Sequence, residues 1–560
     1  MTVVSAEARV RSLAERLSVA GDAEIAALLS ARGVSAHASW RDWFDAADAL
    51  LSTDAVTSAV RSLPRDVLCD LTEGAGGERL GLTDADGRPY APVLTAIPDG
   101  LTRTPTSAPV AASQNAAAHA AERAFTGMSA MAEVLLDGMR TPMPRVGGRL
   151  GANERRRLTH EGIVRDPDEA DILVQAAETA GLIRADDRRW LVTPAGAEWT
   201  RAATPHRWEH LALGLREAIP DGIRPVSGAS GWVDPELWPE AYPLAAGWPE
   251  EADRWRRMFE LAGLIAADGE PAWARPLREG RDADPSALLA LLPAEVDRVF
   301  LQNDLTAISP GTLSPPLDVR LRAMAVRESH AQASTYRFTE GSVSSALAAG
   351  ETAESIREFL GGLSITGVPQ PLAYLIDRTA GRHGLVRVSL EPETGRTIVS
   401  SPDHHLVATI AVDQSLRAVG LVADGALLRT RADWRAVFWA LSDARYPVVA
   451  IDEAGETIVL DRNRVAPDAA PAEQRHRSLI ERLRESEADD TDTAWLEREL
   501  NAAVKGKSTL IVSVAMPDGS TRELTLEATG MGGGRLRGLD RGADVERTLP
   551  IRSITGVRPA

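Results

Sequence analysis

Arginine is the side chain in this sequence best suited to binding chemistry, because its guanidinium group pairs with phosphate oxygens. Between positions 140 and 160 six arginines accompany a single acid, Glu154. They are Arg140, Arg145, Arg149, Arg155, Arg156 and Arg157. The last three follow Asn153, a residue suited to cap a helix, so we expect them on the first turn of a short helix. This group is our candidate phosphate surface, and an ordinary solvated face is the alternative.

Catalytic motifs are missing from the sequence. A phosphate-binding loop needs a lysine after a glycine-rich turn, and the only lysines, Lys505 and Lys507, do not lie in such a motif. The glycines at 530–534 fall between two predicted strands, which indicates a hairpin turn. His404 and His405 would point to opposite faces of a strand and would not share a metal ion. We therefore expect no catalytic residue, no metal and no cofactor, so the protein is predicted not to be an enzyme.

Length and composition limit the class of protein. At roughly 150 residues per domain, the 560 residues predict three or four domains. The apolar fraction of 44% and the charged fraction of 25% are typical of a globular chain and exclude a fibrous or mostly disordered one. Acids outnumber bases 80 to 62, giving a net charge of −18. The whole chain is thus no nonspecific binder of polyanions, and any nucleic-acid surface must be a local basic patch.

Cysteine usage and hydropathy indicate the compartment. The single cysteine, Cys69, has no partner for an internal disulfide, which fits a reducing environment. Arginines at positions 9, 11 and 16 interrupt the first apolar stretch, so no signal peptide is expected. No stretch of eighteen apolar residues occurs, so we predict a cytoplasmic protein without membrane contact.

A repeated motif suggests two related domains. The sequence Ala-Gly-Leu-Ile-x-Ala-Asp occurs at 180–186 and again at 262–268, 82 residues apart. Each copy follows an amphipathic helix and precedes a tryptophan, Trp190 or Trp273. A helix that ends at glycine and leads into a strand hairpin is typical of a recognition helix and its wing. The pattern therefore predicts tandem winged helices.

The first predicted recognition helix carries the wrong charge for a DNA groove. Residues 167–180 contain Asp168, Glu169, Asp171 and Glu178 and no basic residue. A helix in the major groove would bring these acids against phosphates. Two interpretations stay open: DNA contact through the wing, with Arg184, Arg188 and Arg189, or a protein-docking role.

From residue 296 onward the pattern mixes strands and helices. Strands are predicted at 299–309 and 336–339, and helices at about 341–349, 352–361 and 370–382. A hairpin is expected across residues 386–400, with further strands at 407–412 and 417–422. The last fifty residues read as short strands, with Met516-Pro517-Asp518-Gly519 as a hairpin turn.

Residues 298–388 resemble a known family. The matching elements are a strand at Gln302-Asn303-Asp304, the segment Tyr336-Arg337-Phe338-Thr339, the helix pair at 341–363 and the helix entry Pro369-Gln370-Pro371. They are similar to the N-terminal, helicase-associated domain of XPB-type helicases. Members of that family occur attached to DNA helicases and as motor-less proteins of actinobacteria, and the preceding region resembles the motor-less group. The chain lacks the phosphate loop and DExH box of the motor, so the resemblance implies an accessory role.

The C-terminal residues resemble a WYL-type module, a small barrel of bacterial DNA-linked regulators. Gly534-Arg535-Leu536 stands where that family has Trp-Tyr-Leu, so only the leucine matches. The resemblance also includes Arg552-Ser553-Ile554 near the end of the chain. Ligand sensing through the family's aromatic residues is therefore not expected.

Together these observations predict a multidomain α+β protein. Its expected parts are a helical N-terminal domain (1–100), a linker (101–127), a winged helix (128–215), a winged-helix-like repeat (216–285), an XPB-N-like α/β domain (286–465), a helical connector (466–505) and a small WYL-like β-barrel (506–560). The predicted function is a non-catalytic DNA-associated protein, either an adaptor for an XPB-like helicase or other DNA-processing protein, or a factor in DNA repair or transcription. The alternative is a protein–protein scaffold or ligand-responsive regulator without DNA contact.

Overall fold

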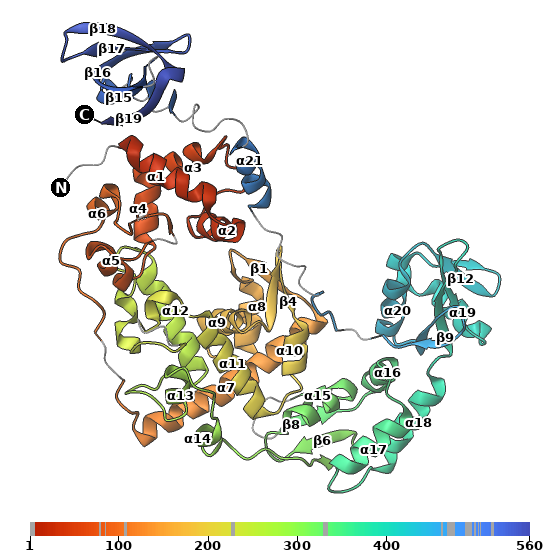
Figure 1. Ribbon diagram of the computed structural model, residues 1–560. Helices are drawn as coiled ribbons and strands as arrows, with labels where there is room; N and C mark the ends of the chain where they lie inside the picture. Colours follow the sequence, from red (N-terminus) through yellow and green to blue (C-terminus); the bar gives the residue numbers. More distant parts are fainter. Residues whose placement is uncertain are drawn as a thin grey trace.

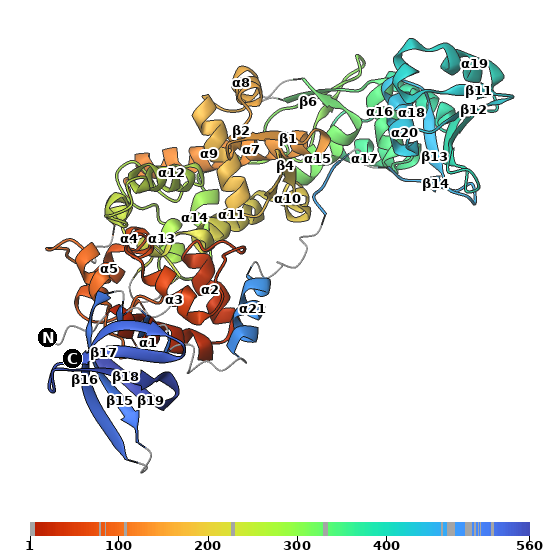
Figure 2. The same cartoon turned by 90° about the horizontal axis from the view of Figure 1, so that it is seen from above.

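The computed structural model describes residues 6–559 apart from a set of short segments. These segments are 78–79, 85, 106–108, 226–229, 329–333, 461–462, 468–475, 488–495, 498–499, 502, 505 and 517–519. The molecule is elongated, with the N-terminal helices beside the C-terminal sheet at one end and α19 at the other (Figure 1, Figure 2). Within the described residues no helix is long and apolar enough to cross a membrane.

The N-terminal region is helical, as predicted. Its helices are α1 (Ala6–Val19), α2 (Asp22–Ala31), α3 (Trp43–Leu51), α4 (Thr53–Arg61), α5 (Arg65–Thr72) and α6 (Ala91–Ala96). Leucines at helical spacing along α1 and α2 bury their side chains in one common core. The spacing of apolar residues in the sequence therefore accounts for the buried faces of these helices.

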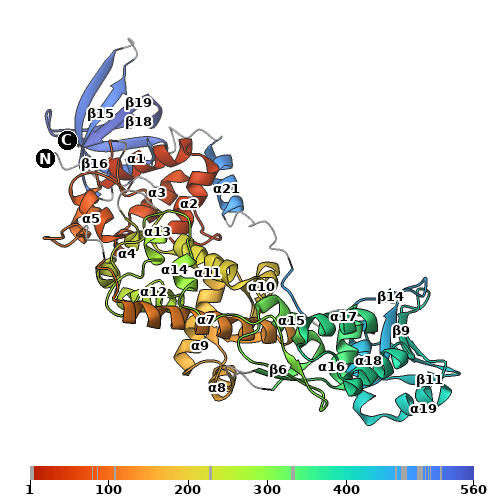
Figure 3. The same cartoon turned by 90° about the horizontal axis from the view of Figure 1, so that it is seen from below.

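The chain returns to this N-terminal core from far along the sequence. Helix α21 (Arg477–Glu487) buries Leu479, Ile480 and Leu483 in it, and all three views place α21 beside the red helices (Figure 3). Arg484 donates hydrogen bonds to the carbonyl oxygens of Ser18 and Ala20. The predicted connector thus contains a helix that belongs to the N-terminal core.

The centre of the molecule is built on one long helix, α7 (Gln114–Arg140). Its first half corrects the predicted linker, which was drawn to residue 127. Ser113 caps the helix, and the buried alanines Ala120 and Ala124 allow close approach of a neighbouring segment, because a Cβ on Gly263 would lie 2.7 Å from the Ala120 carbonyl oxygen. The small side chains suggested a linker, but they are the packing face of a helix.

Around α7 lie the other helices and one small sheet. The helices are α8 (Ala152–His160), α9 (Pro167–Thr179), α10 (Pro194–Trp199), α11 (Thr204–Ala218), α12 (Trp248–Leu261), α13 (Ala274–Arg278) and α14 (Ser286–Leu289). The strands are β1 (Met143–Val146), β2 (Arg149–Leu150), β3 (Ile183–Asp186) and β4 (Arg189–Val192), in the order β2-β1-β4-β3. All ladders are antiparallel, and the first repeat copy forms the β3–β4 hairpin.

The second repeat copy corrects the expectation of a second wing. Its helix, α12, ends as predicted at Gly263, which has a φ of 67°. Beyond it the described chain forms one isolated bridge, between Ala266 and Gly269, in place of a hairpin. Glu270 instead pairs with the main chain at residues 110–112, accepting from the Ala112 amide at 2.9 Å. Residues 110–112 therefore pair with Glu270 where the returning strand of a wing hairpin was expected.

Residues 296–460 form two α/β units. The first has the sheet β5-β6-β8-β7 and four helices, and the second has the sheet β11-β12-β10-β9-β13-β14 and two helices. The elements of the first are β5 (Phe300–Leu301), β6 (Thr306–Ser309), α15 (Pro315–Met324), β7 (Val326–Arg327), β8 (Ser334–Arg337), α16 (Glu340–Ala348), α17 (Ala353–Leu363) and α18 (Gln370–Arg382). Those of the second are β9 (Val386–Leu390), β10 (Thr397–Ser400), α19 (His404–Val412), β11 (Val422–Asp424), β12 (Leu427–Thr430), α20 (Trp434–Asp443), β13 (Val448–Ile451) and β14 (Thr457–Ile458).

Three predicted strands in this part were wrong. Residues 299–309 form the hairpin β5–β6, which turns at Leu305 with a φ of 66°, so Gln302-Asn303-Asp304 is a turn. Residues 404–412 are the helix α19, because the Asp403 carboxylate accepts from the amides of His405 and Leu406 and caps it. Residues 414–419 are a 3₁₀ helix. At these two helices, 404–412 and 414–419, a polar capping residue outweighed the β propensity of the apolar side chains.

The C-terminal unit is a five-stranded antiparallel sheet. Its strands are β15 (Thr509–Ala515), β16 (Thr521–Gly532), β17 (Arg535–Asp540), β18 (Val545–Pro550) and β19 (Ile554–Pro559), in the order β18-β17-β16-β15-β19. The predicted barrel is not closed: among the described residues no ladder joins the edges β18 and β19. The 3₁₀ turn Ile551–Ser553 separates β18 from β19 and leads the chain from one edge of the sheet to the other. The predicted turn at 516–519 lies mostly outside the described residues.

Candidate nucleic-acid interface

The predicted arginines gather around two hairpin turns at one end of the small sheet. The β1–β2 turn runs through Gly147 and Gly148, whose φ angles of 58° and 79° require glycine-like freedom. The β3–β4 turn runs through Asp187, with a φ of 49°, and Arg188. The Arg145 amide donates to the Arg188 carbonyl oxygen at 2.7 Å, so the two turns lie side by side.

Four of the nine predicted arginines lie on these hairpins without an acidic partner among the described residues. We name them the hairpin arginines: Arg149, Arg184, Arg188 and Arg189. Arg149, Arg188 and Arg189 are exposed and Arg184 is half-buried. Arg156 on α8 is also exposed and has no ion pair in the described part of the chain. These guanidinium groups are available to an anion from solvent.

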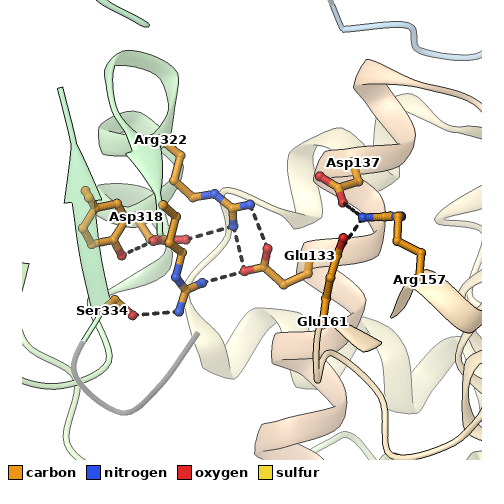
Figure 4. A network of polar contacts seen from close by, with 9 residues as sticks. Glu133, Asp137, Arg157, Glu161, Asp318, Arg322 and Ser334 are labelled. Carbon is orange, nitrogen blue, oxygen red and sulfur yellow. Dashed lines mark hydrogen bonds and ion pairs between the residues drawn. The ribbon is translucent and has the colours of Figure 1, made fainter. Parts of the chain in front are cut away.

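The other two arginines of the triplet on α8 serve the fold instead. Arg155 pairs with Asp171 at 3.1 Å, and that carboxylate also accepts from the Leu150 amide at 3.1 Å. Arg157 contacts Glu154 at 2.5 Å, and it contacts Asp137 and Glu161 at 3.1 and 2.7 Å (Figure 4). Its hydrogen bond to Glu154 raises the pKa of Arg157 above its ordinary value. The triplet therefore does not form one phosphate surface.

The two remaining predicted arginines also have partners in the protein. Arg145 lies over the Trp190 ring, 5.0 Å from its centroid, and donates to the Asp187 carbonyl oxygen at 3.4 Å. Arg140 ends α7 and already takes part in an interaction within the molecule. Adjacent arginines in the sequence thus reach different environments, because α8 turns each one towards a different neighbour.

Helix α9, the predicted recognition helix, is enclosed by the protein. Seven of its thirteen residues are buried, including the unbroken run 170–174, and it packs against α7, α8, α11 and α12. Its exposed residues, Pro167, Asp168 and Glu178, lie towards its two ends, so the middle of the helix belongs to the core. Its acids belong to the fold too, since Asp171 binds Arg155 and Glu169 pairs with Arg165 at 2.8 Å. The burial of its middle and the acids at its ends therefore both oppose insertion of α9 into a groove.

The hairpin surface carries acids as well as arginines. Asp186 and Asp187 are exposed at the β3–β4 turn. Burial raises the pKa of the Glu178 carboxyl, on the last turn of α9, above its usual range, and Arg145 opposes this effect. The arrangement suits contacts at separate points along a phosphate backbone more than an extended positive groove.

A buried ion-pair network joins α7 to the first α/β unit (Figure 4). Glu133 accepts from Arg322 on α15 through both of its oxygens at 2.8 Å, and from Arg327 on β7 at 2.6 Å. The side chains of Glu133, Arg322 and Arg327 are only 11%, 9% and 18% exposed. Removing one partner of a buried charge network costs about 3 to 5 kcal/mol. The network therefore fixes this unit against the helix that leads into the hairpins.

Tyr336 extends the network towards β8. Its hydroxyl donates to the Asp318 carboxylate at 2.5 Å, and Asp318 also lies 3.6 Å from Arg322. Burial, with the adjacent Asp318 charge, raises the pKa of the Tyr336 hydroxyl. The ion-pair network around Glu133 was not anticipated from the sequence. The available sequence signal is Glu133 itself, a lone glutamate within the apolar stretch 127–136.

No metal centre is found in the residues that the structure describes. No group of three or more histidine, cysteine or acidic side chains lies close enough to hold an ion there. His404 and His405 begin helix α19 and are exposed, so the strand geometry assumed for them was wrong.

Comparison with known proteins identifies one domain. A family model described as a helicase conserved C-terminal domain matches residues 299–424. The match spans the first α/β unit and continues to β11 of the second, and it includes both arginines that bind Glu133. No curated protein matches the chain. Residues 299–424 are thus similar to a helicase domain, and this similarity suggests a function associated with nucleic acid.

Proposed function

We propose that this protein is a non-catalytic, helicase-associated adaptor that contacts DNA phosphates through the hairpin arginines. One observation carries the proposal: the helicase-type domain at 299–424 is held by Glu133 to α7, and α7 leads directly into the β1–β2 hairpin. A force or displacement on that domain would therefore reach the hairpins through a rigid helix.

The mode of contact follows from what is exposed. Because the middle of α9 is buried, the predicted recognition helix offers few side chains to the base edges of a groove. Arginines on hairpin turns reach phosphates, which carry no sequence information. The proposed adaptor thus binds DNA with little sequence preference and with strong dependence on salt.

The finer assignments are also part of this proposal. The order α7-β1-β2-α8-α9-β3-β4, with β4 between β1 and β3 in the sheet, supports a winged helix whose groove-facing helix has become largely part of the core. The absence of a motor motif from the sequence supports a protein without helicase activity of its own. An XPB-like helicase or another DNA-processing protein is the proposed partner, and the domain at 299–424 overlaps the XPB-N resemblance. The five-stranded C-terminal sheet is compatible with a WYL-like module.

The proposal is tested by fluorescence anisotropy with single-stranded, duplex and forked DNA at a series of salt concentrations. In the variant Arg149→Gln/Arg188→Gln/Arg189→Gln the slope of log K against log salt should fall by about 2 to 3, since each phosphate contact contributes about 0.7 to 0.9. The matched control is Arg41→Gln/Arg61→Gln/Arg88→Gln, which removes three exposed arginines from the N-terminal region. An unchanged slope in the first variant, or an equal loss in both, contradicts the hairpin assignment.

A scaffold without DNA contact is the second candidate function. The exposed pair Asp186 and Asp187 at the tip of the wing favours it, because these carboxylates would repel phosphates and attract a basic protein surface. The variant Asp186→Asn/Asp187→Asn separates the two functions. It should strengthen DNA binding if the hairpins contact phosphate, and leave DNA binding unchanged if they dock a protein.

A further inference from the structure

The β16–β17 hairpin of the C-terminal sheet presents an unusual outer face. The register pairs Gly530 with Arg537 and Gly532 with Arg535, so these four residues share one face. On the other side of β17 the same face continues with Thr548 and Pro550 of β18. The opposite face holds Leu536 and Gly538, which are buried. Arg535 and Arg537 thus stand beside Gly530, Gly532, Thr548 and Pro550, and the same face continues beyond them with Leu539, Glu527 and Glu546.

The charges of this sheet fall into two groups. Arg541, Arg547 and Arg558 each pair with an acid, respectively Glu527, Asp540 and Glu523, at no more than 2.9 Å. Arg535 and Arg537 are exposed and have no ion pair among the described residues. Residues 506–560 hold eight basic against six acidic residues, a balance of +2 in a chain of −18. Arg535 and Arg537, which lie beside Gly532 and Gly530, therefore contribute unpaired positive charge to this unit.

Gly530 adjoins a register shift of the β16–β17 ladder between Ala528 and Gly530, but neither Gly530 nor Gly532 has a positive φ angle that would require glycine. Gly533 and Gly534 have φ angles of 61° and 70° and make the tight turn, and a Cβ at Gly538 would meet the Glu527 carbonyl oxygen at 3.0 Å. Gly530 and Gly532, in contrast, lack positive φ angles, and a Cβ there would meet nothing within 4 Å. Glycine weakens a strand interior and commonly marks a bulge or the close approach of a ligand or another backbone, and Gly532 lies two residues beyond the register shift.

We infer that this face binds the phosphate backbone of nucleic acid, as a second contact separate from the hairpin arginines. Residues two apart on a strand are about 7 Å apart, so Arg535 and Arg537 can each take a phosphate of one strand. The open main chain at Gly530 and Gly532 lets that strand lie close to the sheet. No aromatic side chain lies on this face beside them, so the contact is with phosphates and not by base stacking. The inference deepens the proposed function, since both take nucleic acid as the ligand.

The test uses the full chain, oligo-dT and a duplex of the same length, with binding measured across a salt series. In Arg535→Gln/Arg537→Gln the slope of log K against log salt should fall by about 1.4 on the single strand or 1.8 on the duplex. The control Arg541→Gln/Arg558→Gln removes equal charge from the same sheet at two exposed ion pairs, and it should keep the wild-type slope. A wild-type slope in the first variant overturns the inference, as does an equal fall in the control.

A second variant tests the surface without changing its charge. Gly530→Val/Gly532→Val fits the strand geometry and should keep or raise the melting temperature of the sheet, while the added side chains block the backbone and weaken binding several-fold. Unchanged binding with a folded sheet overturns the close approach. Since the hairpin variant Arg149→Gln/Arg188→Gln/Arg189→Gln is measured beside these, loss of slope in only one set identifies which of the two surfaces is real.

Discussion

The two copies of the Ala-Gly-Leu-Ile motif begin alike and end differently. Both stop a helix at a glycine with positive φ, Gly181 at 73° and Gly263 at 67°, and both precede a buried tryptophan. Only the first copy continues into a hairpin, because in the second Glu270 pairs with residues 110–112. The motif therefore encodes the end of a helix, and the surrounding chain decides whether a wing follows.

This difference also separates the roles of the two copies. The first copy presents Arg184, Arg188 and Arg189 on its hairpin, whereas residues 266–273 of the second contain no arginine. The second copy lies against α7 instead, and α12 covers α9. The first copy therefore forms a surface hairpin. The second copy packs against the core helices that position this hairpin.

The largest expected difference between the copies is at the glycines. Gly263→Ala should lower the free energy of local unfolding by about 2 to 5 kcal/mol, because αL strain of about 1 to 2 kcal/mol adds to overpacking of about 1 to 3. The clash is with the Ala120 carbonyl oxygen and the Ala124 Cβ, at 2.7 and 2.9 Å. Gly181→Ala meets nothing within 4 Å and should cost only the strain, about 1 to 2 kcal/mol.

Native-state hydrogen exchange of α7 and α12 measures both glycine variants locally, which suits a chain of several domains. The two variants serve as controls for each other, since the substitution and the backbone conformation are the same. Equal losses of protection would show that the packing against α7 does not distinguish the copies.

The tryptophans give the next difference. Trp273 Nε1 donates to the Gly263 carbonyl oxygen at 2.8 Å, whereas the buried Trp190 Nε1 has no hydrogen-bond partner among the described residues. Trp273→Phe leaves a buried carbonyl unpaired, so it should cost about 1 to 3 kcal/mol more than Trp190→Phe. Hydrogen exchange of α12 and α9 reports the two losses, and an equal or larger loss for Trp190→Phe would contradict the role assigned to the hydrogen bond.

The sequence was most informative where the structure is local. Helix spacing predicted the N-terminal helices, and the glycine end of α9 with its hairpin was confirmed, because these patterns depend on neighbours in the chain. The second wing failed because residues 110–112 lie far away in sequence. The linker prediction failed because alanine is common both in flexible segments and in close-packed helices.

The candidate site likewise has a part that local sequence predicted and a part that it did not predict. Hairpin register placed Arg188 and Arg189 on an exposed turn, which the sequence anticipated as a wing. The pairing of Arg155 with Asp171, and of Glu133 with Arg322, depends on helices that meet only in the folded chain. Clusters of charge in sequence therefore overstated the phosphate surface on α8 and missed the network that anchors the helicase-type domain.

The smallest expected difference lies at equivalent glutamates, Glu178 and Glu260, two positions before the repeated alanines. Burial raises the pKa of Glu178, so the folded state holds its proton more readily than the unfolded state does. Its charged form therefore costs stability at neutral pH, and stability is regained as pH falls through the folded-state pKa. Glu178→Gln should raise stability at pH 7 by only about 0.3 kcal/mol, because the carboxylate is only partly desolvated and solvent still screens its charge.

Glu260 is expected to respond with the opposite sign. It lies 3.4 Å from Arg256 and 3.7 Å from Arg123, so Glu260→Gln removes two partly exposed ion pairs and should lower stability by about 0.2 to 1 kcal/mol. Thermal unfolding at pH 7 and at pH 5 compares the two variants with the wild type. The gain from Glu178→Gln should shrink at pH 5, because the wild-type carboxyl is then closer to protonation. A gain in both variants, or a loss in both, would mean that these equivalent positions are not electrostatically distinct.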